Sequence, residues 1–163
     1  MENNTLKIPA RDHAGVYIPP PLLYVATFFL SKELQRVATL PSDWLNSNGA
    51  HTARWLVLTA ALLVLLPALF RFALSRNTLI TIKPAQSLQT TGIYALSRNP
   101  MYLGLLILYA AIAFFAGNSW TFLAIGPLML IVQLYVIRKE ERYLQRAFGD
   151  EFERYKAKVR RWI

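Results

Sequence analysis

The sequence predicts an all-α integral membrane protein with about four transmembrane helices, followed by an amphipathic C-terminal helix or helices. Of its 163 residues 55% are hydrophobic, and the mean hydropathy is positive, which is unusual for a soluble domain of this size. The 39 residues between Arg98 and Arg138 carry no charge. Such a stretch is too long for one buried helix and is close to two bilayer crossings. Residues 1–163 are therefore expected to form a single membrane domain.

Two spans are expected within residues 14–75. The stretch 14–31 is uncharged, and its proline run at 19–21 fits a helix entrance, where a missing N–H group has no partner to lose. The chain opens with polar residues and shows no convincing cleavage site. This first segment is therefore expected to be a retained membrane helix rather than a signal peptide.

A polar loop is expected between these spans, over residues 37–53. The second span covers the uncharged residues 55–70. It extends toward Ser75 if Arg71 snorkels its guanidinium to the interface. Pro67 is expected to kink this helix.

Residues 76–163 are expected to hold a surface connector, a helical hairpin and the C-terminal segment. The connector, 76–100, is polar and shows neither a helical stripe nor a strand alternation. The apolar stretches 101–116 and 121–137 are separated by a short polar turn at 117–120. They should pack as an antiparallel pair of spans.

The C-terminal segment 138–163 holds nine Lys and Arg against five Asp and Glu. Apolar residues recur in it at roughly helical spacing: Leu144, Phe148, Phe152, Tyr155, Val159 and Trp162. This pattern is typical of an amphipathic helix, or a pair of helices, that lies on the membrane. Gly149 is the candidate break.

The basic residues also predict the orientation. One side of the proposed spans carries Arg71, Arg76, Lys83, Arg98 and the basic tail, whereas the turn at 117–120 has no cation. By the positive-inside rule that side faces the cytoplasm, across the plasma membrane or bacterial inner membrane. Four spans place the N-terminus inside too. Cations also surround the first loop and leave a different first span open: Lys32, Arg36 and Arg54.

Composition excludes several kinds of site. The net charge of +9 would suggest nucleic acid for a soluble chain, but here the cations flank apolar segments, where they anchor helix ends and attract anionic lipids. Membrane lipids are expected partners and nucleic acid is not. The absence of cysteine rules out disulfides and thiolate metal sites. His13 and His51 lie in poorly patterned loops, so no metal site is expected.

Uncommon polar residues gather before the third predicted span and after the fourth. Glu140 and Glu141 close the fourth span, and the other cluster precedes or opens the third: Gly92, Tyr94, Arg98, Asn99, Pro100, Tyr102 and Gly104. Because the two spans form a short hairpin, both clusters reach the same membrane face and can converge on one pocket.

The chemistry of these residues suits a zwitterionic nucleoside that carries a sulfonium. A helix N-terminus opened by Pro100 can take a carboxylate, and Glu140 can accept hydrogen bonds from an ammonium or a ribose. Tyrosine faces suit a cation. S-adenosylmethionine combines these groups.

The pattern resembles the superfamily of isoprenylcysteine carboxyl methyltransferases and phospholipid methyltransferases, which are integral membrane enzymes. The resemblance runs from Lys83 to the end and rests on three motifs in order: Thr91-Gly92-Ile93-Tyr94, Ser97-Arg98-Asn99-Pro100-Met101-Tyr102-Leu103-Gly104, and Glu140-Glu141 with Leu144, Phe148-Gly149 and Tyr155. It implies that S-adenosylmethionine lies in a pocket enclosed by the last membrane helices and the C-terminal segment and is reached from the cytoplasm. A lipid or other lipophilic acceptor would enter from the bilayer.

Carried over by position, the resemblance implies cofactor contacts for Gln86, Ser87, Leu88, Gln89, Gly92, Tyr94, Asn99, Pro100, Met101, Tyr102 and Glu140. Arg98 and Glu141 are the candidate catalytic residues, and Arg138 is a candidate for binding the substrate. The expected reaction is in-line displacement at the sulfonium methyl group. Positioning and exclusion of water would supply most of the rate enhancement.

Two positions depart from the eukaryotic prenylcysteine enzymes. Asn99 replaces their histidine, and Val136 stands where they have an arginine one turn before the cofactor glutamate. A prenylcysteine carboxylate is therefore not favoured. A phospholipid amine, another carboxylate, a thiol and an isoprenoid-like alcohol all remain open as acceptors.

Two other functions compete with methyl transfer. One is an NADPH-dependent reductase of sterol-like molecules, suggested by analogy of fold and disfavoured by the small size of this chain. The other is a non-catalytic membrane subunit whose basic tail binds anionic lipid. In that case Tyr94 and Tyr102 would be interface anchors, and Gly104 would serve helix packing.

Overall fold

The computed structural model describes residues 13–74 and 87–163, and the regular structure within these ranges is entirely helical. Two long helices and a short 3₁₀ turn form the N-terminal part: α1 (Pro20–Val37), η1 (Asp43–Asn46) and α2 (Asn48–Leu74). A second 3₁₀ turn and the remaining helices follow: η2 (Gly92–Ala95), α3 (Pro100–Ala116), α4 (Ser119–Leu123), α5 (Ile125–Ile131), the π-helical turn η3 (Val132–Ile137) and α6 (Arg138–Lys158).

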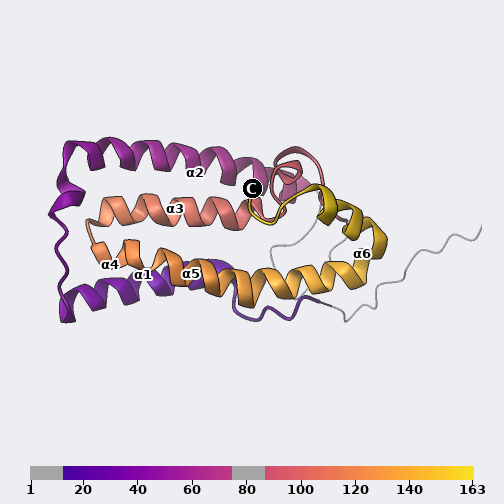
Figure 1. The fold of residues 1–163 in the computed structure, drawn as a ribbon, viewed down its shortest axis with the longest axis horizontal. Helices are drawn as coiled ribbons and strands as arrows, with labels where there is room; N and C mark the ends of the chain where they lie inside the picture. The colour runs from indigo at the N-terminus through magenta and orange to yellow at the C-terminus, as the bar shows by residue number, and fades with distance from the viewer. Residues whose placement is uncertain (1–12, 75–86) are drawn as a thin grey trace, which may run out of the picture.

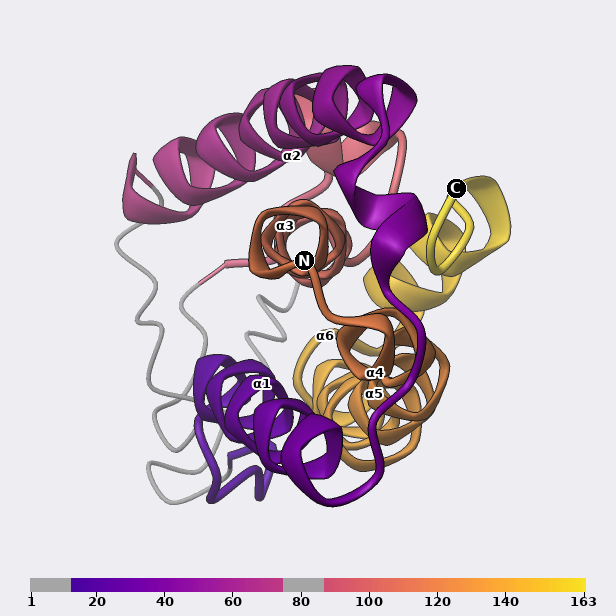
Figure 2. The same cartoon turned by 90° about the vertical axis from the view of Figure 1, so that its left-hand side faces the viewer.

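The long helices run side by side along the length of the molecule (Figure 1). Seen end-on, α3 lies in the centre, with α2 on one side and α1 and α4–α5 on the other (Figure 2). The described part of the chain contains two helical stretches long and apolar enough to cross a membrane, Asn48–Leu74 and the continuous stretch Ser119–Lys158. The apolar helix α3 is shorter. Two of the four predicted spans thus meet this criterion.

The central helix α3 packs closely on α2 because Gly104 has no side chain. A Cβ atom at Gly104 would lie 2.8 Å from Cβ of Leu65, a separation that real side chains do not adopt. The packing role considered for Gly104 therefore holds. The predicted turn between α3 and α4 is present as well, with Gly117 in the left-handed conformation (φ 61°).

The N-terminal helices differ from their expected bounds. The first begins at Pro20 rather than at residue 14, and its two leading prolines occupy the first helical positions, as expected. The second begins at Asn48, inside the stretch predicted as a loop, because the Ser47 hydroxyl accepts the N–H of Ala50 (3.2 Å) and caps it. The polar residues 37–53 predict a loop, but the last of them form the first turns of α2. This helix continues through Pro67.

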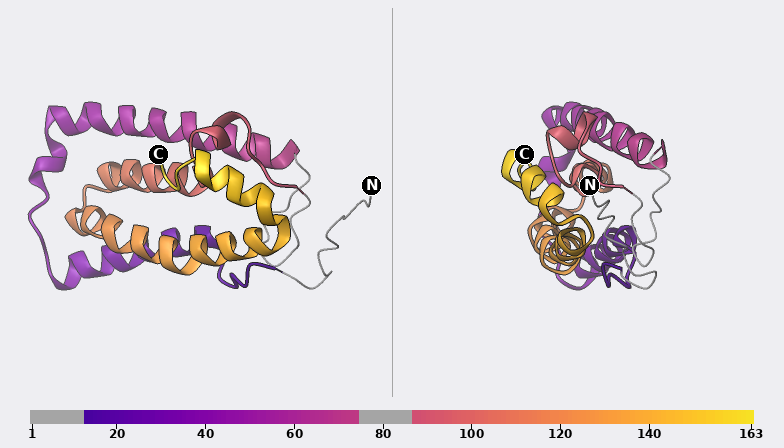
Figure 3. Two further views of the ribbon diagram at one scale, coloured as in Figure 1. Left: turned by 45° about the vertical axis from the view of Figure 1, so that its right-hand side comes forward. Right: turned by 90° about the vertical axis from the view of Figure 1, so that its right-hand side faces the viewer.

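The C-terminal segment breaks at Gly149, as predicted. Gly149 has φ 47° and ψ −121° inside α6, which is a conformation that glycine adopts without penalty. After this break the chain doubles back along the end of the bundle (Figure 3). The last residues therefore return to the start of α3 rather than continuing outward.

Candidate functional site

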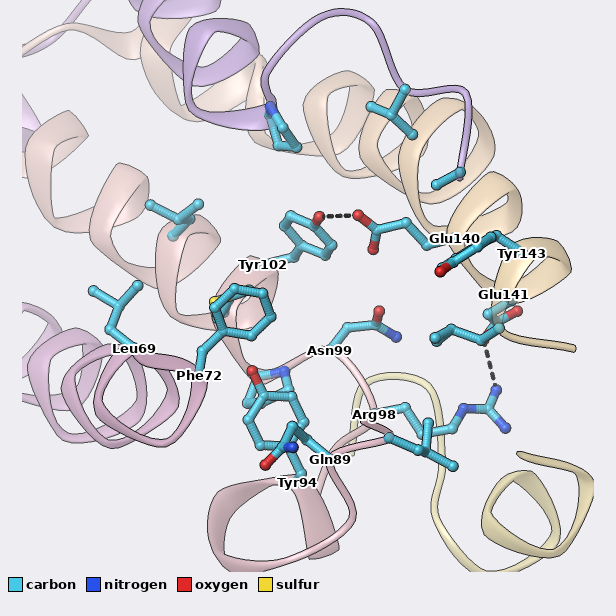
Figure 4. Close-up of a pocket in the computed structure, with 18 of the residues that line it drawn as sticks. Leu69, Phe72, Gln89, Tyr94, Arg98, Asn99, Tyr102, Glu140, Glu141 and Tyr143 are labelled. Atoms are coloured by element: carbon cyan, nitrogen blue, oxygen red, sulfur yellow. Dashed lines mark hydrogen bonds and ion pairs between the residues drawn. The ribbon is translucent and has the colours of Figure 1, made fainter. Parts of the chain in front are cut away.

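The two polar clusters converge at one end of the bundle, as their hairpin connection predicted. A cavity of about 600 Å³ lies between them. Its walls come from the segment 14–21, helix α2, the segment 87–105 and both halves of α6 (Figure 4). Residues from both halves of the chain thus build one site.

A short hydrogen bond joins the two clusters. The hydroxyl of Tyr102, near the start of α3, donates to Oε1 of Glu140 at 2.6 Å. A contact with α1 helps to fix the backbone of Tyr102, since its carbonyl accepts a hydrogen bond from the hydroxyl of Tyr24 (3.2 Å). Glu140 lies three residues beyond the apolar stretch 121–137. Burial raises the pKa of Glu140 to about 7, although the bond from Tyr102 opposes this shift.

Arg98, Glu141 and Arg161 form an ion-pair network beside this bond. Arg98 Nη2 lies 2.9 Å from Oε1 of Glu141, and the two side chains are 9% and 15% exposed. Arg161 takes the same carboxylate with two donors, Nε at 3.1 Å and Nη2 at 2.5 Å. Both oxygens of Glu141 are therefore engaged, an arrangement that anchors the C-terminal segment and leaves this carboxylate ill-suited to act as a base.

The end of the chain is fastened across the start of α3 by backbone contacts. The N–H of Arg98 donates to the carbonyl of Arg160 (3.0 Å), and Asn99 Nδ2 donates to the carbonyl of Arg161 (3.0 Å). In the second half of α6, the Tyr155 hydroxyl donates to the carbonyl of Tyr94 (2.6 Å). Burial raises the pKa of Tyr155 to about 12, so this hydroxyl keeps its proton.

Two polar atoms beside the cavity have no hydrogen-bond partner among the described residues. They are the hydroxyl of Tyr94 and Nε of Arg98, and both atoms are buried. Tyr94 is 7% exposed, and burial raises its pKa. A buried polar atom without a partner costs free energy in the ligand-free protein. Such atoms are typical of sites where a ligand completes the bonding.

Most of the predicted site residues line this cavity. The lining includes Ser87, Leu88, Gln89, Tyr94, Arg98, Asn99, Pro100, Met101, Tyr102, Glu140 and Glu141. Gln86 lies outside the described residues. Their individual roles in binding or catalysis stay predictions.

Two predicted residues do not line the cavity. Arg138 is exposed at the start of α6. Gly92 has φ +64° and packs against Arg71, whose Nε would lie 2.9 Å from a Cβ atom at Gly92. Its positive φ forms the turn that begins η2. Val136, the position compared with the arginine of the prenylcysteine enzymes, is fully buried in the hydrophobic core.

The sequence did not indicate several lining residues. These are Leu65, Leu69 and Phe72 of α2, Tyr143 and Phe152 of α6, and the segment 14–21. Helix α2 offered no polar signal that marked one of its faces. The segment 14–21 was read as part of a membrane span, and its contribution depends on a contact across more than 100 residues: Lys139 Nζ donates to the carbonyl of Gly15 (3.1 Å).

Comparison with known proteins agrees with this geometry. A sequence model of phospholipid methyltransferases matches residues 55–151, a range that includes most of α2, the 87–102 segment and the Glu140–Glu141 pair. The chain belongs to the phospholipid methyltransferase family. An uncharacterized protein of Haemophilus influenzae is 44% identical over 63 residues, which are 39% of this chain and all of that protein. No solved structure matches the chain.

Membership of this family implies a methyltransferase for lipid-like substrates. It agrees with the superfamily resemblance of the motifs and favours methyl transfer over the reductase and the non-catalytic subunit. Within the described residues there is no cluster of three or more potential metal ligands.

Proposed function

We propose that the protein is an S-adenosylmethionine-dependent methyltransferase that modifies a lipid or other lipophilic acceptor at the cytoplasmic face of a membrane. The observation that supports it most is the cavity itself. In this member of the phospholipid methyltransferase family, the start of α3 and the Glu140–Glu141 pair line the same cavity. The hydroxyl of Tyr102 and Oε1 of Glu140 join them by a hydrogen bond of 2.6 Å.

The residues of the cavity fit S-adenosylmethionine on three counts. Glu140 offers a carboxylate oxygen to an ammonium or a ribose, since its Oε2 has no hydrogen bond among the described residues. The first turn of α3 lies on the cavity, and its Asn99 cap makes no side-chain bond to the N–H groups there, so they can receive a carboxylate. The unpartnered hydroxyl of Tyr94 supplies a further polar contact.

The other side of the cavity suits the acceptor. Leu65, Leu69 and Phe72 of α2 face it together with Leu105 of α3, and these side chains offer hydrocarbon surface without hydrogen-bonding groups. An apolar chain or ring can lie there while its nucleophilic atom reaches toward the polar side.

S-adenosylmethionine supplies a methyl group on a sulfonium, which an oxygen, nitrogen or sulfur nucleophile can accept. The protein's task is to hold both partners in line and to keep water away. The C-terminal segment, fastened through Arg98 and Asn99, provides the cover. The chain need not provide a base if the acceptor arrives as an anion or a free amine.

The membrane arrangement that we propose keeps four spans, which are α1, α2, α3 and the apolar residues 121–137, so that α6 with Glu140 lies outside the membrane-spanning segments. The cavity then opens at the end of the bundle that bears Arg71, Arg98 and the basic C-terminal segment, so the positive-inside rule places it at the cytoplasm.

Calorimetric titration of the detergent-solubilised protein with S-adenosylhomocysteine tests the proposal, with NADPH as a parallel titrant. Saturable binding near micromolar affinity is expected for S-adenosylhomocysteine alone. Glu140→Gln removes the charge that would hold the ligand ammonium and should weaken binding by about 100-fold or more.

The matched control is Glu153→Gln, which removes an exposed carboxylate that pairs with Lys156 on the same helix and should leave the affinity unchanged. Retained affinity in Glu140→Gln would overturn the assignment. Binding of NADPH alone would favour the reductase, and binding of neither by folded protein would favour the non-catalytic subunit.

A further inference from the structure

The segment Ala14–Pro21 precedes the range that the family model matches, yet it forms one wall of the cavity. Six of its residues line it: Ala14, Val16, Tyr17, Pro19, Pro20 and Pro21. In Figure 4 this segment passes on the same side of the cavity as the Tyr102–Glu140 bond, while Gln89 and Tyr94 lie opposite. We refer to these eight residues as the N-terminal strap.

The strap is held in place at three points along its length. Val16 is 1% exposed and belongs to the hydrophobic core together with Tyr102 and Val136. The N–H of Ile18 donates to the hydroxyl of Tyr135 (3.4 Å). Lys139 donates to the carbonyl of Gly15 (3.1 Å), and its ammonium lies 4.2 Å from the centre of the Tyr135 ring.

The side chain of Lys139 is thus directed toward the strap. The positive-inside rule alone would account for a basic residue at this position but not for this contact. Lys139 immediately precedes Glu140. One helix turn therefore positions both the Glu140 carboxylate and the strap that passes beside it.

The chemistry of the strap wall is that of a rigid hydrocarbon surface. Each proline fixes its own φ and lacks an N–H donor. Pro20 and Pro21 occupy the start of α1, and the wall is completed by Pro19, Ala14, Val16 and Tyr17. Apart from the hydroxyl of Tyr17, the side chains of this wall offer shape rather than hydrogen bonds. The wall is otherwise apolar, as are Leu65, Leu69 and Phe72, which line the cavity from α2.

We infer that the N-terminal strap is the acceptor-specificity element of this site, against which the apolar part of the acceptor lies, and that Lys139 is its positioning residue. This inference rests on the proposed function. It assigns the choice of acceptor to a segment outside the family-matched range, whereas the cofactor side belongs to the matched range. Acceptors with a hydrocarbon chain or ring next to the nucleophilic atom fit such a wall.

Photolabelling with a long-chain fatty alcohol that carries a diazirine on its chain tests the inference. The full chain would be labelled in lipid nanodiscs with bound S-adenosylhomocysteine, and the labelled residues would be mapped by mass spectrometry. Label on Val16 is decisive, because Val16 lines the cavity and its 1% exposure keeps it out of contact with the surrounding bilayer. An excess of unlabelled fatty alcohol should suppress this label.

Lys139→Met removes the ammonium that holds Gly15 and should reduce label on Val16 by about five-fold, within the range of one charge-assisted hydrogen bond. Label on Leu69 and Phe72 should persist. Lys139→Arg should restore label on Val16. Lys158→Met, an exposed lysine at the end of α6, is the matched control and should change nothing.

Each outcome separates this inference from the proposed function. Label confined to α2, or unchanged label on Val16 in Lys139→Met, would overturn the role of the strap even if S-adenosylhomocysteine binds normally. Conversely, loss of S-adenosylhomocysteine binding in Lys139→Met would show that Lys139 serves the cofactor side, and would overturn its assignment to acceptor positioning alone.

Discussion

The two ends of the helical bundle are both rich in polar residues but use them differently. At the end away from the cavity, Ser119 Oγ donates to the carbonyl of Pro41 (2.7 Å) and accepts from Trp44 Nε1 (3.2 Å). Asn118 caps α4 by accepting the N–H of Trp120 (2.8 Å), and its amide donates to the carbonyl of Ser31 (3.2 Å). These groups are neutral and bond mainly to one another. We refer to these six residues with Ser42 as the turn network.

At the cavity end the groups are charged, and bonding is incomplete. Glu140 has a raised pKa, and the buried atoms Tyr94 Oη and Arg98 Nε have no partner among the described residues. The hydroxyl of Thr121, next to the turn network, also lacks a partner, so the contrast concerns the network and not every residue near it. Polar residues that satisfy one another stabilise a fold, whereas polar residues left open beside a cavity are available to a ligand.

The largest loss of stability is expected from a substitution between the two ends of the bundle, where α2 and α3 are in contact. Gly104→Val would place its Cβ 2.8 Å from Cβ of Leu65 and force the helices apart, with a loss of about 2 kcal/mol in stability. Because Leu65 also lines the cavity, affinity for S-adenosylhomocysteine should fall as well. Thermal unfolding in detergent and calorimetry measure the two effects. Gly126→Val is the control, since a Cβ there meets nothing within 4 Å; equal destabilisation by both would contradict the packing argument.

Removing one hydroxyl from the turn network should affect stability alone. Ser119→Ala leaves the indole N–H of Trp44 and the carbonyl of Pro41 without their partner, at a cost of about 1.5 kcal/mol. Affinity for S-adenosylhomocysteine should stay within about two-fold, because no charged group is disturbed. A large fall in affinity with little change in stability would reverse the comparison of the two ends.

The cavity end should respond to pH near neutrality. Burial raises the pKa of Glu140 to about 7, so this carboxyl is mostly protonated at pH 6 in the ligand-free protein. Since a ligand ammonium prefers the ionised form, the affinity for S-adenosylhomocysteine should rise about ten-fold between pH 6 and pH 8.

The stability of the ligand-free protein should change in the opposite direction. The folded pKa of Glu140 lies above its unfolded value of 4.5, so its favourable contribution is present below pH 4.5 and is lost as pH rises through about 7. Glu140→Gln should flatten both profiles. Calorimetry across this range with wild-type protein and this variant would reveal a residual pH dependence if another group is responsible.

The smallest effect on stability is expected from removing the Tyr94 hydroxyl, which has no hydrogen-bond partner among the described residues. Tyr94→Phe removes a buried hydroxyl without breaking a hydrogen bond to the described residues, so the ligand-free protein should lose no stability. Affinity for S-adenosylhomocysteine should fall about five-fold. Tyr155→Phe is the counterpart, since it breaks the 2.6 Å bond to the carbonyl of Tyr94 and should lower stability. Unchanged affinity in Tyr94→Phe would show that this hydroxyl does not contact the ligand.

The sequence predicted the parts of this site that depend on local order along the chain. The short hairpin between α3 and α5 predicted that the clusters holding Tyr102 and Glu140 converge, and the break at Gly149 was predictable from the residue type. The start of α2 after Ser47 was also predictable, because serine is a common N-cap residue. The polar residues around it favoured a loop instead.

What the sequence did not predict depends on contacts between distant segments. Residues 14–19 form a wall of the cavity because Lys139 and Tyr135 hold them there, and no periodicity reports such a contact. The face that α2 turns to the cavity was equally hidden, because a helix that is apolar all round carries no stripe to orient it. Arg138 is a candidate because it lies close in the chain to Val136, where the prenylcysteine enzymes have their substrate arginine, yet it is exposed and does not line the cavity.

The π-helical turn Val132–Ile137 sets the rotational phase of everything that follows it. Bonds from residue i to i+5 turn the chain by less per residue than an α-helix does, so a segment of this length shifts later side chains around the axis by about one residue. Had these six residues been α-helical, a neighbour of Glu140 would face Tyr102 instead. The placement of the carboxylate in this cavity is thus a matter of helical pitch as well as of sequence, and helical wheels drawn across residue 132 will assign the wrong faces to the charged residues beyond it.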